Sequence, residues 1–124
     1  MQFPHTLTFY ADETNASPVL TLSLARAVTF SQRLRGLLFH PAPPEGHALL
    51  IEHCNAVHTI GMRYPLDLIF LDRNHRILRI RPNVPPNRPF ILGGFRAASV
   101  LEATSGWLPL DLLCSGMRVV ITEI

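Results

Sequence analysis

Eleven prolines divide this chain of 124 residues into short segments. Three of them fall within residues 41–44, and four more lie with two glycines between Pro82 and Gly94. A proline inside a helix or a central strand removes a backbone hydrogen-bond donor, so no long helix can cross either stretch. The chain therefore has to fold from short elements, and Pro82–Gly94 is expected to be a long loop ordered by proline.

Between the prolines, apolar residues mostly alternate with polar or small ones, which is typical of half-buried strands. The polar cluster Asp12–Asn15 is expected to be the turn between the first two strands. Asp72–His75 is expected to join the two arms of a central hairpin. The predicted strands are Thr6–Tyr10, Val19–Leu24, Ala48–Glu52, Leu66–Leu71, Ile77–Arg81, Ala97–Ala103 and Arg118–Ile124.

The period of the apolar residues becomes helical over Phe30–Phe39, and Thr29 or Ser31 can cap the start of this helix. A second short helix or turn is expected near the C-terminus, at Trp107–Leu113. Seven or so strands against one good helix predict a mainly β fold. We expect a compact antiparallel β-sandwich or distorted barrel, built as a single domain from residues 1–124.

Composition and charge narrow the class of protein. The hydrophobic fraction of 48% and the charged fraction of 16% indicate a globular domain with its own core. The net charge is only +2 and the basic residues are dispersed, so no nucleic-acid partner is expected. All eleven basic residues are arginine, which excludes a Schiff-base lysine. No apolar run approaches the ~18 residues of a membrane span and no secretory signal opens the sequence, so we expect no membrane partner and a cytoplasmic location.

The stretch His53–Asp67 gathers the largest number of chemically capable side chains. It contains two histidines, a thiol, a thioether, a guanidinium and a carboxylate, and it lies between the apolar segments Ala48–Ile51 and Leu66–Leu71. Polar groups held between two pieces of core are typical of a binding or active site. They are equally typical of a buried polar network that serves only the fold.

Residues spread over most of the chain from about residue 19 onward carry a family resemblance. They are Arg35-Gly36-Leu37-Leu38, Gly46 to Cys54, Val57-His58-Thr59, Gly61-Met62, Pro65-Leu66-Asp67, Phe70-Leu71-Asp72, Asn83, Pro85, Val100-Leu101-Glu102, Gly106 and Gly116. With these segments in this order, the sequence resembles the prokaryotic family catalogued as domain of unknown function one hundred and ninety-two. The resemblance implies a small β-rich single-domain fold and no activity, because the family has no agreed function. The sequence departs from the family pattern at His53, His75 and Met117, where proline, glycine and an acid are expected.

Cys54, His58 and Met62 are the candidate ligands for a metal. Thiolate, imidazole and thioether suit a soft transition metal such as Cu(I) or, less well, zinc. Their spacing matches no established metal motif, so no cofactor is expected and a packed Met62 beside a hydrogen-bonded His58 is favoured. Cys54 and His58 also form a candidate nucleophile and base, and metal-bound water is the other route to a hydrolase. Cys54 and Cys114 are expected to be free thiols.

Charged residues form a second set of candidates. Arg35 and Arg63 are candidate partners for Asp67 and Glu102, and a buried ion pair is favoured for Arg35 with Glu102. Asp67 begins a buried strand, where a carboxylate is expected to accept backbone amides or to meet an arginine.

The leading hypothesis is a small binding or accessory domain that recognises a small anionic ligand or a peptide. The cleft is expected between His53–Asp67 and the Pro82–Gly94 loop, where His58, Thr59 and Arg63 offer donors to a carboxylate or phosphate. A hydrolase and a structural protein-interaction module are the alternatives, and the oligomeric state stays open. The full set of candidate ligand-binding residues is His58, Thr59, Arg63, Asp67, Arg35 and Glu102.

Overall fold

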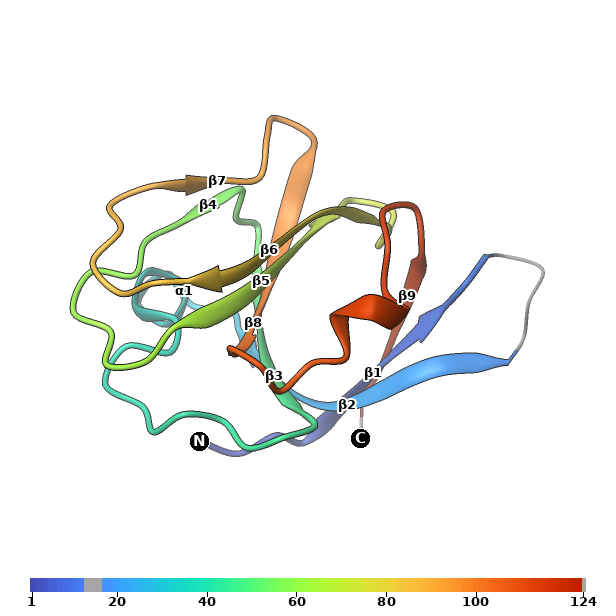
Figure 1. Cartoon of the computed structure of the whole chain (residues 1–124), viewed down its shortest axis with the longest axis horizontal. Helices are drawn as coiled ribbons and strands as arrows, with labels where there is room; N and C mark the ends of the chain where they lie inside the picture. Colours follow the sequence, from blue (N-terminus) through green and yellow to red (C-terminus); the bar gives the residue numbers. More distant parts are fainter. Residues whose placement is uncertain (13–16, 124) are drawn as a thin grey trace.

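A computed structural model describes residues 1–12 and 17–123, and its strands form two β-sheets (Figure 1). The strands are β1 (His5–Tyr10), β2 (Pro18–Ala27), β3 (His47–Glu52), β4 (Ala56–Val57), β5 (Leu66–Asp72), β6 (Ile77–Val84), β7 (Ile91–Leu92), β8 (Ala97–Thr104) and β9 (Arg118–Thr122). The larger sheet has the strand order β6-β5-β8-β3-β2-β1-β9, and β4 pairs with β7 in a separate two-stranded sheet. The fold is mainly β, as the sequence predicts.

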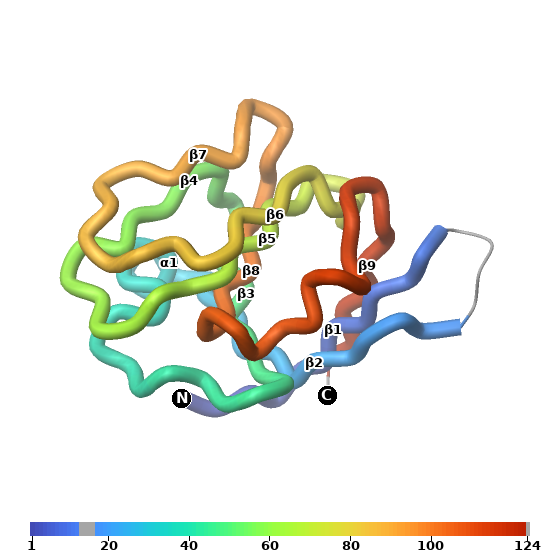
Figure 2. Tube along the Cα trace, in the orientation of Figure 1, coloured from blue at the N-terminus to red at the C-terminus, as the bar shows by residue number. Residues whose placement is uncertain are grey.

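The larger sheet is open and mixed, so the expected antiparallel sandwich or barrel is wrong in its details. β2 and β3 run parallel, while the other neighbouring strands are antiparallel. Parallel strands need a crossover between them, and helix α1 (Phe30–Arg35) with the proline-rich segment 41–46 provides it (Figure 2). The sheet also curls, because an isolated bridge between Arg76 and Arg118 brings the starts of β6 and β9 together.

The seven predicted strands agree with the structure except near their ends, whereas the short strands β4 and β7 were not predicted. β6 continues to Val84, so the predicted Pro82–Gly94 loop loses its first residues to a strand and contributes β7 near its end. The predicted C-terminal helix or turn is a single 3₁₀ turn, Leu110–Leu112. Residues 13–15 of the predicted Asp12–Asn15 turn, and residue 124 of the last predicted strand, lie outside the described residues.

The expected helix Phe30–Phe39 is too long by four residues. Thr29 caps its start: the Thr29 side chain accepts a hydrogen bond from the backbone amide of Gln32, whose own side chain accepts one from the Thr29 amide. The helix ends at Gly36, whose φ of 55° and ψ of −128° leave the helical region. Phe30 and Leu34 are 73% and 62% exposed, so the apolar side of this helix does not face the core. In the part of the chain that the structure describes, no helix has the length and apolarity to cross a membrane.

The two faces of the large sheet carry two separate apolar clusters. Leu50, Ile69 and Leu101 belong to the cluster on one face, and Ile51, Phe70 and Val100 belong to the cluster on the other. Because β3, β5 and β8 are central and covered on both faces, their residues are buried in succession rather than alternately, and β3 and β5 contain continuous apolar runs. The second face is the one on which the candidate site lies.

Candidate functional site

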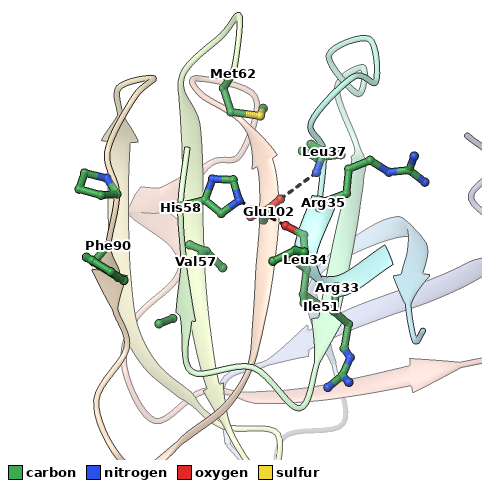
Figure 3. Close-up of a pocket in the computed structure, with 13 residues that line it drawn as sticks. Arg33, Leu34, Arg35, Leu37, Ile51, Val57, His58, Met62, Phe90 and Glu102 are labelled. Atoms are coloured by element: carbon green, nitrogen blue, oxygen red, sulfur yellow. Dashed lines mark hydrogen bonds between the residues drawn. The ribbon is translucent and has the colours of Figure 1, made fainter. Parts of the chain in front are cut away.

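A pocket of about 180 Å³ lies between α1, β4 and the segment that precedes β7 (Figure 3). We call it the Glu102 pocket. Its walls are mostly apolar, and the side chains of Arg33, Arg35, His58 and Glu102 are its polar lining groups. The apolar lining residues are Leu34, Leu37, Ile51, Ala56, Val57, Met62, Pro89 and Phe90.

Pairing of β4 with β7 builds one side of this pocket. Val57 pairs with Ile91, and the backbone amide of Gly93 donates a hydrogen bond to the carbonyl of Asn55 at 2.8 Å. These contacts place the stretch His53–Asp67 against the proline-rich loop, the two segments between which the sequence predicts a cleft. The third wall, formed by α1 and the residues after it, was not part of that prediction.

Glu102 lies on β8, two residues after the buried Val100 and therefore on the same face of the sheet. The residue is 3% exposed, and its Oε1 accepts a hydrogen bond from the backbone amide of Leu37 at 3.3 Å. Burial raises the pKa of the Glu102 carboxyl to about 7, although the Leu37 amide acts in the opposite direction. Both protonation states of the carboxyl are therefore populated near neutral pH.

The ion pair expected between Arg35 and Glu102 is wrong. Arg35 is exposed, and Figure 3 shows its side chain directed away from the Glu102 carboxyl. Across residues 1–12 and 17–123, the ion pairs are those of Arg26 with Glu52 and with Glu123. Glu102 is therefore held by a backbone amide and by apolar packing.

Both ring nitrogens of His58 are occupied. Nδ1 accepts a hydrogen bond from the Ile60 backbone amide at 3.2 Å, and Nε2 lies 3.3 Å from the carbonyl oxygen of Leu34. A carbonyl can only accept, so we assign the proton to Nε2 in the neutral ring. His58 thus ties the stretch after β4 to α1 and holds the pocket closed on that side.

The side chains of Thr59 and Asp67 form hydrogen bonds with backbone groups and do not line the Glu102 pocket. Thr59 is fully buried: its hydroxyl donates to the carbonyl of Pro85 at 2.7 Å and accepts from the backbone amide of Arg88 at 2.9 Å. Asp67 accepts the backbone amides of Asn83 at 2.9 Å and residue 106 at 3.2 Å. The sequence-based expectation that Asp67 meets backbone amides is confirmed.

Arg63 is exposed and lies in another depression, of about 470 Å³, with Phe39 and Tyr64. The structure therefore does not gather the six candidate ligand-binding residues into one site. It brings His58 and Glu102 into the Glu102 pocket together with part of Arg35, and it places Thr59, Arg63 and Asp67 elsewhere.

Cys54 shows no sign of an activated nucleophile. Its thiol donates a hydrogen bond to the carbonyl of Ala56 at 2.9 Å, and burial raises the pKa of the Cys54 thiol. Cys54 borders a different depression from the one that His58 lines. Cys54 and Cys114 are both free thiols, as expected.

The candidate metal ligands do not form a recognisable metal centre. No three His, Cys, Asp or Glu side chains within the described ranges 1–12 and 17–123 lie close enough together to hold an ion. Met62 is 8% exposed and belongs to the apolar cluster on the Glu102 face of the sheet. Soft-metal binding by Cys54, His58 and Met62 stays the alternative to the prediction that no cofactor binds.

Sequence reasoning missed the apolar entrance of the Glu102 pocket. Leu34 and Phe90 are 62% and 79% exposed and both line the pocket. Phe30 and Leu34 have the spacing of one face of a helix, and this helix has no acidic residue in its first turn. The spacing predicts that both side chains pack against the core. A solvent-facing stripe has the same spacing as a core stripe, so the pattern alone does not separate them.

Comparisons with known proteins identify the family and the fold. The family model of DUF192, described as "Uncharacterized ACR", matches residues 11–121. A crystal structure of a protein of unknown function from Novosphingobium aromaticivorans DSM 12444 has a TM-score of 0.77 at 19% identity, covering 93% of this chain and 83% of that one. A protein described as a proposed transcription regulator from Sinorhizobium meliloti 1021 has a TM-score of 0.79 at 21% identity, covering 97% and 95%. No curated protein matches the sequence.

Proposed function

We propose that this chain, which belongs to the DUF192 family, is a binding module that takes an apolar side chain of a peptide partner into the Glu102 pocket. The observation that carries the proposal is a preformed cavity of about 180 Å³ with two large apolar side chains, Leu34 and Phe90, exposed at its entrance. Exposed apolar side chains around a cavity are typical of interaction sites.

The size of the pocket suits one side chain. A water molecule takes a share of roughly 30 Å³ in the liquid, so the cavity has room for about six waters or one medium-sized apolar group. Burying a side chain such as leucine or phenylalanine there contributes roughly 1.5–3 kcal/mol before the cost of ordering the peptide. A free energy of this size gives weak or moderate binding, so the peptide needs further contacts around the buried side chain.

The charges near the entrance favour acidic residues beside the anchor. Arg33 lines the pocket, and its Nε is buried without a hydrogen-bond partner. Arg88 is exposed next to the lining residue Pro89. Neither arginine has an acidic partner among the ion pairs of residues 1–12 and 17–123. We therefore expect the apolar anchor to be flanked by carboxylates, in keeping with the anionic or peptide ligand that the sequence suggests.

Nuclear magnetic resonance titration with three capped tripeptides tests the proposal. The peptides are acetyl-Asp-Leu-Asp-amide, its alanine counterpart acetyl-Asp-Ala-Asp-amide, and acetyl-Lys-Leu-Lys-amide. We expect saturable shifts of the Val57, His58 and Phe90 amides with the first peptide and much weaker shifts with the other two. Equal responses to all three peptides, or shifts confined to other parts of the chain, would contradict the proposal.

Two substitutions of exposed leucines sharpen this test. Leu34→Asp places a charge at the entrance, and we expect it to weaken binding of the Asp-Leu-Asp peptide at least about tenfold, since burying an unpaired charge is costly. Leu112→Asp changes a leucine that is 51% exposed on the 3₁₀ turn and should leave the affinity unchanged. Unchanged binding by Leu34→Asp would remove the pocket from consideration.

A further inference from the structure

A second pocket, of about 310 Å³, lies beside α1 and differs in chemistry from the Glu102 pocket. Arg35 and Gly36 belong to the walls of both, so the end of α1 separates the two. Polar and charged residues make up half of the lining of the second pocket, and the lining includes no aspartate or glutamate. The side chains that give it this character are His5, Arg26, Gln32, Arg35 and His40.

The two arginines of this pocket are not equivalent. Arg26 is held by Glu52, which also accepts from its Nε at 3.3 Å, and by Glu123, so its charge is already compensated. Arg35 is exposed and takes part in no ion pair within residues 1–12 and 17–123. Figure 3 shows its side chain leaving the Glu102 pocket, and it lines the second pocket. Arg35 is therefore the cation of this pocket whose charge is not matched by an acid.

His5 and His40 add further donors to the same pocket. The Nδ1 atom of His5 is buried and has no hydrogen-bond partner. A buried ring nitrogen without a partner requires a ligand or water to satisfy it. The pKa of His40 is lowered, first by burial and then by the positive charges of Arg35 and the N-terminal amine, which indicates that the Arg35 guanidinium lies near this ring.

We propose that the second pocket is an oxyanion site that binds a carboxylate or phosphate group through Arg35, with His5 and Gln32 as further hydrogen-bond donors. A guanidinium presents paired N–H groups that match the geometry of both anions. An anion there meets no opposing carboxylate in the pocket lining, and it supplies the acceptor that the Nδ1–H form of His5 lacks. Arg35 was predicted as part of an anion site from the sequence, but alongside His58 and Arg63 rather than here.

The position of Arg35 in the last turn of α1 offers a purely structural explanation for its charge. A cation there interacts favourably with the helix dipole. That explanation does not account for the unpartnered His5 nitrogen or for a pocket lined by several cationic and donor groups with no acid. The anion site accounts for all three observations.

Titration of the full chain with sodium sulfate, phosphate and succinate, against sodium chloride at matched ionic strength, tests this proposal. We expect saturable shifts of the Ala27, Gln32 and Gly36 amides with the oxyanions and no saturation with chloride. Tighter binding of phosphate would identify a phosphate group as the ligand, and tighter binding of succinate a carboxylate. Shifts that grow linearly with every salt would overturn the proposal.

Arginine variants distinguish oxyanion binding at a specific site from nonspecific attraction of anions to positive charge. Arg35→Gln should weaken oxyanion binding at least about tenfold, while Arg73→Gln, in the exposed β5–β6 turn, should change it less than about twofold. Arg35→Lys, which keeps the charge and loses the paired donors, should lie between them. Equal binding by the Arg35→Gln and Arg73→Gln variants would refute the site.

The two proposals fail separately. Phe90 lines the Glu102 pocket and not the second pocket, so Phe90→Ala should weaken binding of the Asp-Leu-Asp peptide and leave oxyanion binding unchanged. Loss of oxyanion binding in Phe90→Ala would contradict a separate oxyanion site.

Discussion

The carboxyl group of Glu102 accepts a hydrogen bond from the backbone amide of Leu37 at 3.3 Å, across 65 residues of sequence. This bond ties the central strand β8 to the residue that follows the end of α1, and it forms the base of the Glu102 pocket. The same carboxyl is buried and its pKa is raised to about 7. The geometry of the pocket is therefore coupled to a group that titrates near neutral pH.

Replacing Glu102 by glutamine should change how stability depends on pH. The raised pKa means that the folded state binds more protons than the unfolded state between about pH 4.5 and 7, so the contribution of Glu102 to stability is fully present below that interval and is lost as pH rises through 7. The loss is about 3 kcal/mol for a shift of this size. We expect urea denaturation to show the Glu102→Gln variant gaining about that much relative to the native chain between pH 4.5 and pH 8.

Glu45→Gln is the matched control, because Glu45 is exposed. Its free energy of unfolding should follow that of the native chain across the same pH range. Parallel curves for the native chain and the Glu102→Gln variant would show that Glu102 keeps an ordinary pKa in the folded protein.

Gly36→Ala should destabilise the fold and distort the Glu102 pocket. A Cβ at Gly36 would lie 2.9 Å from Oε1 of Glu102 and 3.3 Å from Cδ1 of Ile51, and the φ of 55° already disfavours a side chain. Gly46→Ala shares the positive φ, 80°, but has no atom within 4 Å of the added carbon. We expect Gly36→Ala to cost about 1–3 kcal/mol more than Gly46→Ala in urea denaturation, and equal costs would show that the contact with Glu102 relaxes freely.

Thr59→Val should loosen the proline-rich loop. The substitution keeps the shape of the side chain but removes the hydrogen-bond partner of the Pro85 carbonyl and of the Arg88 amide, both partly buried, which together should cost about 1–3 kcal/mol. Thr21→Val removes only an exposed hydroxyl contact with Thr8 and should cost less than about 0.5 kcal/mol. Hydrogen exchange should quicken at the Arg88 amide in the first variant, and unchanged exchange there would show that the loop is held by other contacts.

Thiol labelling at pH 7.5 should modify Cys114 well before Cys54. Cys114 is exposed, whereas Cys54 is half-buried and its thiol has a raised pKa and a carbonyl partner. We expect the Cys114→Ser variant to react with iodoacetamide about tenfold more slowly than the Cys54→Ser variant, since the thiolate is the reacting form. Faster labelling of Cys54 than of Cys114 would revive the hydrolase alternative.

Local sequence patterns predicted the structure correctly where the spacing of apolar residues alone decides whether a segment is a strand. The alternation in Thr6–Tyr10 and the apolar run Leu66–Leu71 predicted β1 and β5 to within one residue at each end. Of the two caps that the sequence offered, Thr29 and Ser31, the structure has Thr29, whose side chain bonds within its own turn. The role of Asp67 followed from its position at the start of a buried strand, where the nearest donors are backbone amides.

Long-range contacts were the source of the errors. The helix was expected to reach Phe39. In the structure the backbone leaves the helix at Gly36, and the Leu37 amide donates its hydrogen bond to Glu102. Arg35 was paired with Glu102 on charge alone, yet the two side chains lie on different sides of the end of α1. Local spacing does not tell which residue of a distant segment lies beside a given side chain.

The sequence by itself determined the mainly β class and the positions of the seven longer strands, because these follow from periodicity and from where proline removes backbone donors. The two segments that meet at the cleft were predicted from polar side chains that lie between apolar runs, beside a long loop. Only the tertiary structure decided that β2 and β3 run parallel, that Leu34 and Phe90 stay exposed at a cavity and that Arg35 and His5 line a second pocket. Those outcomes depend on which strands become neighbours, and strand order places residues from distant parts of the chain on one face of the sheet.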